Sequence, residues 1–423
     1  MYSLLRERSL QIPDDRLIRP QTIPLADAVM SASAMFALKF PSMLQFVDSA
    51  QEPGIRHNLG SLFQVAQVPS DTAMREILDP VVTSHFQDLF KPIFAMAQRG
   101  KVLEGFRFMG AYLVSVDGTG CFSSHEIHCQ NCCVKSHRDG TKTFYHQMLA
   151  GVLIHPDRKE VIPLAPEPIA LTDGSTKNDC ERMAAERFLR RLRREHPHLE
   201  IIITEDGLSS NAPHIKLLRE LGMGFILGCQ PGDHKALFDF IDQSEKLGEV
   251  CHHAIVDGAT THEFRWMNQV PLNDANPDVL VNFVEYWEKT GDKLLHFSWV
   301  TDFEINNDNL MQLMRGGRAR WRIENETFNT LKNLGYNFEH NFGHGYQNLS
   351  NNLAVIMMLV FLIDQLQALC CIMFQKAAEK AKRLSRLWEK MRNMFRLISF
   401  ENWEDFLKAL AYGIKVTYII NTS

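Results

Sequence analysis

A glutamate interrupts the apolar face of a charged helix expected over residues 318–332, "RARWRIENETFNTLK". At about 100° of rotation per residue, Glu324 falls on the same narrow face as Trp321, Phe328 and Leu331. A carboxylate in a core-facing stripe costs free energy unless it pairs with a cation or holds a metal ion. Two interpretations follow, an ion pair with the arginine four residues earlier or a metal ligand.

Two aspartates end strand-like runs elsewhere in the chain. Asp117 follows "AYLVSV" within "DGTG", and Asp206 follows "LEIIIT" within "EDGLSSN". Each one alone is compatible with a simple Asp-Gly turn. If the two runs are neighbouring strands, both carboxylates meet at one edge of the sheet, and Glu324 completes a set of three. Such a set repels itself unless divalent cations lie between its members, and Mg²⁺ or Mn²⁺ prefers oxygen ligands. Two ions held there could activate a water or a 3′-hydroxyl and stabilise the leaving oxygen of a phosphodiester.

Cysteine and histidine cluster in "CFSSHEIHCQNCCVKSH", residues 121–137. A C-x2-C pair with nearby histidines suits structural zinc, and the candidate ligands are Cys129, Cys132, Cys133 and His137. The stretch has no second C-x2-C pair, so a reduced loop without an ion stays open as the alternative.

Two further histidines, His340 and His344, lie four residues apart in "EHNFGHG". This is a ligand spacing on a helix, but Gly343 and Gly345 argue against a helix here. We therefore expect two loop histidines rather than metal ligands.

The elements expected around these residues form a mixed α/β core. Residues 1–105 have apolar residues at helical spacing and are expected to form a helical N-terminal region. Residues 106–229 indicate three strands, a helix, a strand, a helix and a strand, with antiparallel and then parallel pairing. A β-rich insertion over 230–310 precedes the second part of the core, 311–374, and a basic helical region, 375–423. This is the order of a ribonuclease H-like mixed sheet, in which the first and fourth core strands are neighbours.

The composition is that of an ordinary globular protein, with 45% hydrophobic and 22% charged residues and a net charge of −5. That charge does not favour nucleic-acid binding, so such a function would depend on the local basic groups at 187–197, 315–322 and 376–396. The apolar run 353–363 is too short to span a bilayer. Nine cysteines without a secretory signal indicate a reducing, intracellular location with no membrane association.

In combination, these features resemble the DDE transposases of bacterial insertion sequences, in the branch with a β-strand insertion before the glutamate. The resemblance extends over most of the chain, from "PLADAVMSASAMFALKFPS" through "DGTG", "KNDCE" and "TEDGL" to "GYNFEHNFGHG". The branch carries a Tyr-x2-Arg-x3-Glu-x6-Lys signature, of which "RWRIE" supplies Arg320 and Glu324. Gly317 occupies the tyrosine position, and the lysine comes one residue late, at Lys332.

The resemblance implies roles for individual residues. Asp117, Asp206 and Glu324 would be catalytic and would hold two Mg²⁺ or Mn²⁺ ions. An alternative register makes Glu326 catalytic together with Arg322. The remaining implied residues would contact DNA, and they are Arg320, Arg322 and Lys332 at phosphates and Trp299 at a flipped base. For Trp299, packing in the core is the alternative.

By the same resemblance, the protein would be a transposase that binds the terminal inverted repeats of its element. It would cut one strand at each end and join the released 3′-hydroxyl to target DNA. We expect a homodimer on double-stranded DNA, in the bacterial cytoplasm at the nucleoid. The alternatives are a metal-dependent nuclease or resolvase without strand transfer and an inactive, transposase-derived DNA-binding protein.

Overall fold

The computed structural model describes residues 1–14, 16, 23–129, 131–170, 173–174 and 177–414. The chain divides into two compact units. Unit 1 comprises Met1–Val102, Gly120–His146 and Phe328–Ser423, and unit 2 comprises Leu103–Thr119 and Gln147–Thr327. Strands β2 (Ala111–Ser124) and β4 (Lys142–Ile154) each pass from one unit to the other.

Unit 1 is mainly helical. Its N-terminal helices confirm the helical prediction for residues 1–105, and Ser42 and Ser70 cap two of them by accepting hydrogen bonds from the Gln45 and Ala73 N–H groups. The N-terminal helices are α1 (Tyr2–Ser9), α2 (Leu25–Ala37), α3 (Met43–Ser49), α4 (Pro53–Phe63), α5 (Asp71–Leu78), α6 (Ser84–Gln87) and α7 (Phe90–Arg99). The C-terminal helices are α12 (Asn329–Asn333), α13 (Leu349–Cys370), α14 (Ile372–Ala381), α15 (Leu384–Leu397) and α16 (Trp403–Tyr412).

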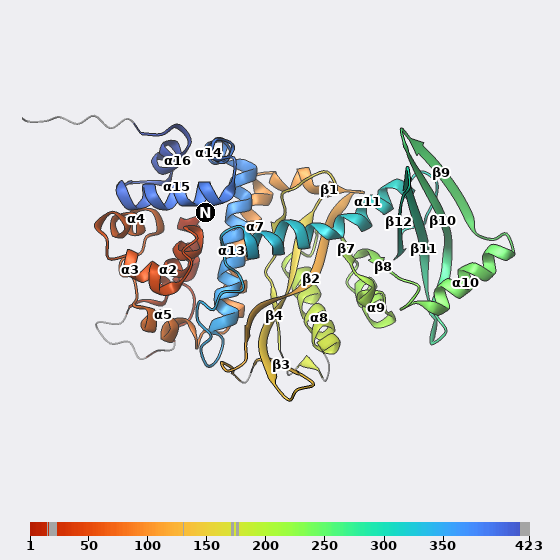
Figure 1. Ribbon diagram of the computed structural model, residues 1–423, viewed down its shortest axis with the longest axis horizontal. Helices are drawn as coiled ribbons and strands as arrows, with labels where there is room; N and C mark the ends of the chain where they lie inside the picture. The colour runs from red at the N-terminus through yellow and green to blue at the C-terminus, as the bar shows by residue number, and fades with distance from the viewer. Residues whose placement is uncertain (15, 17–22, 130, 171–172, 175–176, 415–423) are drawn as a thin grey trace, which may run out of the picture. The chain divides into compact units, whose positions relative to one another are not determined.

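The core of unit 1 is built around α13 and α2. Every residue of α2 is buried, and α13 packs against it (Figure 1). By length and composition α13 could cross a membrane, but most of its residues are buried inside the protein. An apolar helix covered on nearly all sides is a core helix, as the sequence predicts for this segment.

Unit 2 contains a large mixed sheet. Its strands follow the spatial order β4-β2-β7-β8-β12-β11-β10-β9. The pairs β2–β7 and β7–β8 are parallel. The pairs β8–β12, β12–β11, β11–β10 and β10–β9 are antiparallel. The short strands β1 (Arg107–Phe108), β5 (Ile162–Pro163) and β6 (Glu167–Ile169) pair with β2 or β4. The longer strands are β7 (Ile201–Glu205), β8 (Gly224–Gly228), β9 (Cys251–Asp257), β10 (Thr260–Asn273), β11 (Asn276–Thr290) and β12 (Lys293–Thr301). In unit 1, β3 (Cys133–Ser136) pairs with the start of β4.

The helices of unit 2 pack against this sheet. They are α8 (Lys177–Glu195), α9 (Ala212–Glu220), α10 (Lys235–Lys246) and α11 (Leu310–Arg318). Helix α8 contacts β6, α9 contacts β8, α10 contacts β10, and α11 contacts β7 and β8 (Figure 1). The succession of α8, β7, α9 and β8 confirms the predicted alternation of helix and strand over residues 177–229.

Two predicted elements differ from the structure. Within the described part of the strand predicted over 159–174, only β5 and β6 form, because prolines at 163, 166 and 168 cannot donate ladder hydrogen bonds, and residues 171–172 lie outside the described residues. The insertion 230–310 is β-rich as predicted, but it also contains α10. Its last strand, β12, pairs with β8, so the insertion extends the core sheet.

The segment 318–332 is not the continuous α-helix that its spacing predicts. A 3₁₀ turn covers Ala319–Trp321, and a π-helix covers Ile323–Phe328. The rotation per residue therefore changes within the segment, and Trp321 is 48% exposed instead of lying on the buried stripe. Phe328 and Leu331 are buried as expected.

Candidate functional site

The two aspartates lie on neighbouring parallel strands of unit 2. Strands β2 and β7 pair up to Ser115 and Thr204, and Asp117 and Asp206 each follow two residues later. Adjacent strands are about 4.8 Å apart, so the equal offsets bring both aspartates to one region of the sheet. Asp117 lies within β2, which continues to Ser124, and not at a strand end as predicted. Asp206 directly follows the last residue of β7 and accepts a hydrogen bond from the Leu208 N–H at 3.0 Å.

Asp117 interacts electrostatically with Arg320, Asp206 and Glu324. Burial, with smaller contributions from the nearby Asp206 and Glu324, raises the pKa of its carboxyl to about 7, and the Arg320 charge and the Gly118 N–H oppose this rise. The three predicted carboxylates therefore interact electrostatically. Among the described residues, their oxygen atoms do not all lie within 4.8 Å of one another.

Arg320 lies between two of the carboxylates. Its Nη1 is 3.4 Å from Asp117 Oδ2 and 3.6 Å from Glu324 Oε1. The Arg320 carbonyl accepts a hydrogen bond from Ser115 Oγ on β2, which holds the segment against the sheet. The ion-pair interpretation of Glu324 therefore has a physical counterpart, and Glu324 also raises the pKa of Asp117.

The other glutamate of this segment has a different partner. Glu326 Oε1 lies 3.5 Å from Arg322 Nη1, and Arg322 also donates to the Pro156 carbonyl. Glu324 and Glu326 are therefore paired separately, each with the arginine four residues earlier. Glu324 is the one whose charge acts on Asp117.

The remaining residues predicted to contact DNA have partners within their own units. Lys332 pairs with Glu339 at 2.8 Å in unit 1. Trp299, on β12, is only 4% exposed, so its side chain packs in the core, as the alternative interpretation expects. A base could stack on this indole only after the surrounding side chains moved.

Trp299 packs directly against Gly317, the position at which the transposase signature that the sequence resembles has a tyrosine. A Cβ atom at Gly317 would clash with three atoms of the indole ring. The glycine at 317 therefore makes room for the tryptophan at 299. A glycine instead of a tyrosine at this position thus has a packing reason.

Replacing Gly317 with alanine is expected to destabilise unit 2 by about 1–3 kcal/mol, because the indole must move from a filled site. Equilibrium urea unfolding would measure the change. Gly232→Ala is the matched control, since a Cβ there meets no atom within 4 Å. Equal stability of the two variants would contradict the packing of Trp299 on Gly317.

The arginines of α8, predicted as part of a basic track, are engaged within unit 2. Arg187 and Arg191 both pair with Glu167, and Arg190 pairs with Glu220. Arg193 donates to backbone carbonyls, including that of Leu221. These contacts hold α8 to its neighbours, so the basic group has a structural use.

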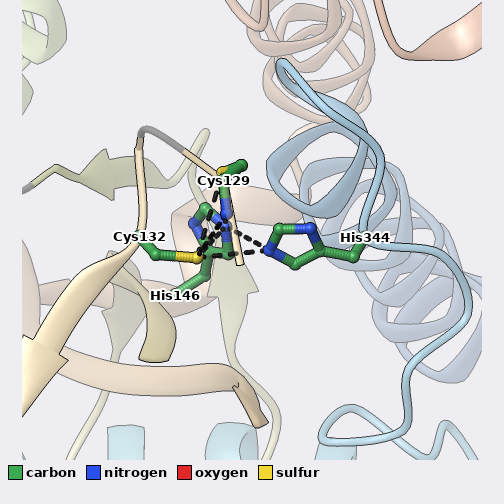
Figure 2. A group of neighbouring side chains, drawn as sticks. All are labelled: Cys129, Cys132, His146 and His344. Atoms are coloured by element: carbon green, nitrogen blue, oxygen red, sulfur yellow. Dashed lines mark hydrogen bonds between the residues drawn. The ribbon is translucent and has the colours of Figure 1, made fainter. Parts of the chain in front are cut away.

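A second group of side chains gathers in unit 1, where two cysteines and two histidines converge (Figure 2). Cys129 and Cys132 come from the connection between β2 and β3, His146 from β4, and His344 from the connection between α12 and α13. All four ligand atoms lie within 4.8 Å of one another. This group could bind a metal ion such as zinc.

Burial sets the protonation of this group. It raises the pKa of the Cys132 thiol to about 12 and, with the neighbouring His344, lowers the pKa of His146 to about 4. Burial also lowers the pKa of His344. Both imidazoles are therefore neutral at pH 7, which is the form that binds metal.

The cluster differs from the predicted ligand set. Cys129 and Cys132 belong to it, but Cys133 and His137 do not, and the His137 Nε2 instead contacts Thr143 Oγ1 at 2.7 Å. The structure brings in His146 and corrects the prediction that His344 is no ligand candidate. Local spacing could not reveal either histidine, because His146 and His344 are 198 residues apart in sequence.

No protein-family model matches the chain, and no curated protein matches it. Its function is therefore inferred from the carboxylates of Asp117, Asp206 and Glu324 in unit 2 and from the Cys/His cluster in unit 1.

Proposed function

We propose that the protein is a DDE-type DNA transposase, which cleaves the ends of its element and joins them to target DNA. The observation that carries the proposal is the arrangement of Asp117 and Asp206 at equal offsets on adjacent parallel strands, with Glu324 acting on Asp117. A carboxyl whose pKa is raised by burial and by other carboxylates is a frequent feature of functional sites.

The strand order of unit 2 supports this proposal. With β2 as the first core strand, β4 is the second, β5 and β6 together the third, β7 the fourth and β8 the fifth. The third and first strands flank the second, and the fourth lies between the first and the fifth. This is the arrangement expected of a ribonuclease H-like core, with the first and fourth strands side by side.

Each residue of the site then has a role. Asp117, Asp206 and Glu324 would hold Mg²⁺ or Mn²⁺, which when bound supplies Lewis-acid charge and an activated water or 3′-hydroxyl. Arg320 forms ion pairs with both Asp117 and Glu324 in the structure described here. If those oxygens held cations, the Arg320 guanidinium would be free to make a bidentate contact with a DNA phosphate.

The proposed partner is double-stranded DNA, bound by a homodimer in the bacterial cytoplasm. The helical N-terminal region would bind the element ends. The ion pair of Arg315 with Asp157 is exposed at both side chains, and such a pair contributes little to stability. A phosphate can therefore replace Asp157 at small cost, which makes Arg315 a candidate backbone contact.

A cleavage assay with the full chain tests the proposal. The substrate is labelled DNA carrying both ends of the genomic element that encodes the chain, with Mg²⁺ or Mn²⁺ present. Glu324→Gln is expected to lose at least about a thousandfold in nicking rate, because a metal ligand contributes several kcal/mol to the transition state. Glu326→Gln is the matched control and should retain nicking.

Other outcomes separate the alternatives. Loss only in Glu326→Gln would keep the function but assign catalysis to the other register. Nicking without joining to target DNA would support a nuclease or resolvase instead. Tight binding of the ends without any nicking by the wild type would identify an inactive DNA-binding derivative.

A further inference from the structure

We propose that unit 1 holds one structural zinc ion, bound by the Sγ atoms of Cys129 and Cys132 and the Nε2 atoms of His146 and His344. The proposal depends only on the geometry of this cluster and is independent of the proposed transposase activity. It keeps Cys129 and Cys132 of the ligands predicted from sequence and adds two histidines that the sequence does not suggest.

Five distances among the four atoms match a zinc tetrahedron, and the remaining pair, Cys129 Sγ and His344 Nε2, lies within 4.8 Å. Zinc bonds of about 2.3 Å to sulfur and about 2.0–2.1 Å to nitrogen place ligand pairs about 3.8 Å (S–S), 3.5 Å (S–N) and 3.3 Å (N–N) apart. Here Cys129 Sγ is 3.9 Å from Cys132 Sγ and 3.5 Å from His146 Nε2. Cys132 Sγ is 3.4 Å from His146 Nε2 and 3.2 Å from His344 Nε2, and the two Nε2 atoms are 3.2 Å apart.

The hydrogen bonds of the ligands also suit a cation. The Nδ1–H of His344 donates to the Gly345 carbonyl at 2.9 Å, so the lone pair of Nε2 faces the cluster. The Cys129 N–H donates to Cys132 Sγ at 3.4 Å, and a sulfur that had exchanged its proton for zinc would keep this hydrogen bond.

A buried carboxylate positions the loop that carries His344. Asp79 accepts hydrogen bonds from four successive backbone N–H groups, those of Tyr346, Gln347, Asn348 and Leu349. These groups lie at the start of α13, where the helix dipole favours an anion. Gly345 has a φ of +67°, and a Cβ there would clash with Asp79. The loop is therefore built to hold one conformation.

A further contact joins the two loops. Asn131, between the two cysteines, donates from Nδ2 to the Gln347 carbonyl at 3.0 Å. The cysteine loop and the histidine loop thus meet through a hydrogen bond as well as through the cluster. This hydrogen bond joins residues more than 200 positions apart close to the proposed ion.

The ligand set indicates the metal and its role. Two thiolates and two imidazoles in tetrahedral arrangement select zinc over the hard ions Mg²⁺ and Mn²⁺. Four protein ligands leave no position for substrate, which is the pattern of a structural centre. Cys132, His146 and His344 are buried, as expected for a site that stabilises the fold. The ion would fasten the β2–β3 connection and β4 to the loop before α13.

Metal analysis of the purified full-length protein tests the proposal. We expect about one zinc per chain in the wild type, and at most about a tenth of that in Cys132→Ser and in His344→Ala. Cys133→Ser and His137→Ala are matched controls, because the same residue types lie close in sequence but outside the cluster. Both controls should keep their zinc.

A second measurement covers the case in which the ligand variants do not fold. Wild-type protein loaded with Co²⁺ should show the visible bands of tetrahedral cobalt together with sulfur-to-cobalt charge transfer. His344→Cys, which keeps four ligands, should still bind zinc and should strengthen the charge-transfer band. Wild type that takes up neither zinc nor cobalt would overturn the proposal, as would zinc lost in Cys133→Ser but kept in His344→Ala.

Discussion

Asp117→Asn is expected to abolish DNA cleavage and at the same time to stabilise the folded protein at pH 8. The first effect follows from the proposed function, since asparagine is a poor ligand for Mg²⁺ and the loss should reach about a thousandfold or more. The second follows from the carboxyl's surroundings, where burial raises its pKa from 3.8 to about 7. Ionised Asp117 costs the folded state free energy that neutral asparagine does not.

The stabilisation should depend on pH with a defined sign. Between about pH 4 and pH 7 the folded protein keeps a proton on Asp117 that the unfolded chain has released, so the stability of the wild type falls as pH rises through this range. Each unit of pKa difference corresponds to about 1.4 kcal/mol. Because Arg320 loses one partner in the variant, we expect a net gain of about 1–3 kcal/mol at pH 8 and almost none at pH 4.

Thermal unfolding of wild type and variant at both pH values would measure this effect. Asp257→Asn is a close control, because Asp257 stands in the same tripeptide, Val-Asp-Gly, but is exposed on β9. It should change neither stability nor cleavage. An equal gain at pH 4 and pH 8 would show that charge is not the cause, and retained cleavage by Asp117→Asn would remove Asp117 from the site.

Much of the core could be predicted from sequence because its elements have regular periods. The β-branched run before Asp206 and the apolar run before Asp117 are strands, and their parallel pairing is confirmed. A strand pattern with a period of two depends on local residues alone, so it survives without knowledge of the tertiary structure. The order of these strands and helices along the chain is the reason that Asp117 and Asp206 could be predicted to lie on neighbouring strands.

The prediction failed where the backbone leaves regular geometry. Glu324 is predicted to share a helix face with Trp321 only if the rotation per residue about the helix axis is constant. The π-helix over Ile323–Phe328 changes this rotation, and Trp321 is exposed. Glu324 nevertheless interacts with Arg320 and Asp117. Its position therefore depends on the packing of the segment against the sheet, which no local period encodes.

The Cys/His cluster shows a different limit of sequence reasoning. The C-x2-C pair belongs to the cluster, and it can be found from the sequence because its two cysteines are close along the chain. His146 has the pattern of a buried strand residue, and His344 lies in a glycine-rich loop, so neither has a local signal of metal binding. A cluster whose members are far apart in the sequence can be recognised only from the tertiary structure, which brings them together.

Removing the carboxylate of Asp364 is expected to cost unit 1 about 3–5 kcal/mol, because it leaves a buried ammonium without a counter-ion. Lys39 Nζ lies 2.6 Å from Asp364 Oδ2, and the Lys39 side chain is completely buried. The Tyr336 hydroxyl donates to the same carboxylate oxygen, and the ammonium lies over the rings of Tyr336 and Trp388. Burial lowers the pKa of Lys39, against the opposing charge of Asp364. Equilibrium urea unfolding of Asp364→Leu would measure the loss.

The double variant Lys39→Met/Asp364→Leu separates the ion pair from the packing. Removing both charges takes away the unpaired ammonium, so the double variant should be more stable than Asp364→Leu alone, even though it carries one more substitution. Replacing a buried pair with apolar side chains of similar volume is often nearly neutral, whereas breaking it by one partner is not. A double variant less stable than Asp364→Leu would mean that Lys39 contributes through its contacts with Tyr336 and Trp388, independently of Asp364. The cation–π contacts, worth up to about 2 kcal/mol when desolvated, would then be the main reason for a lysine at this position.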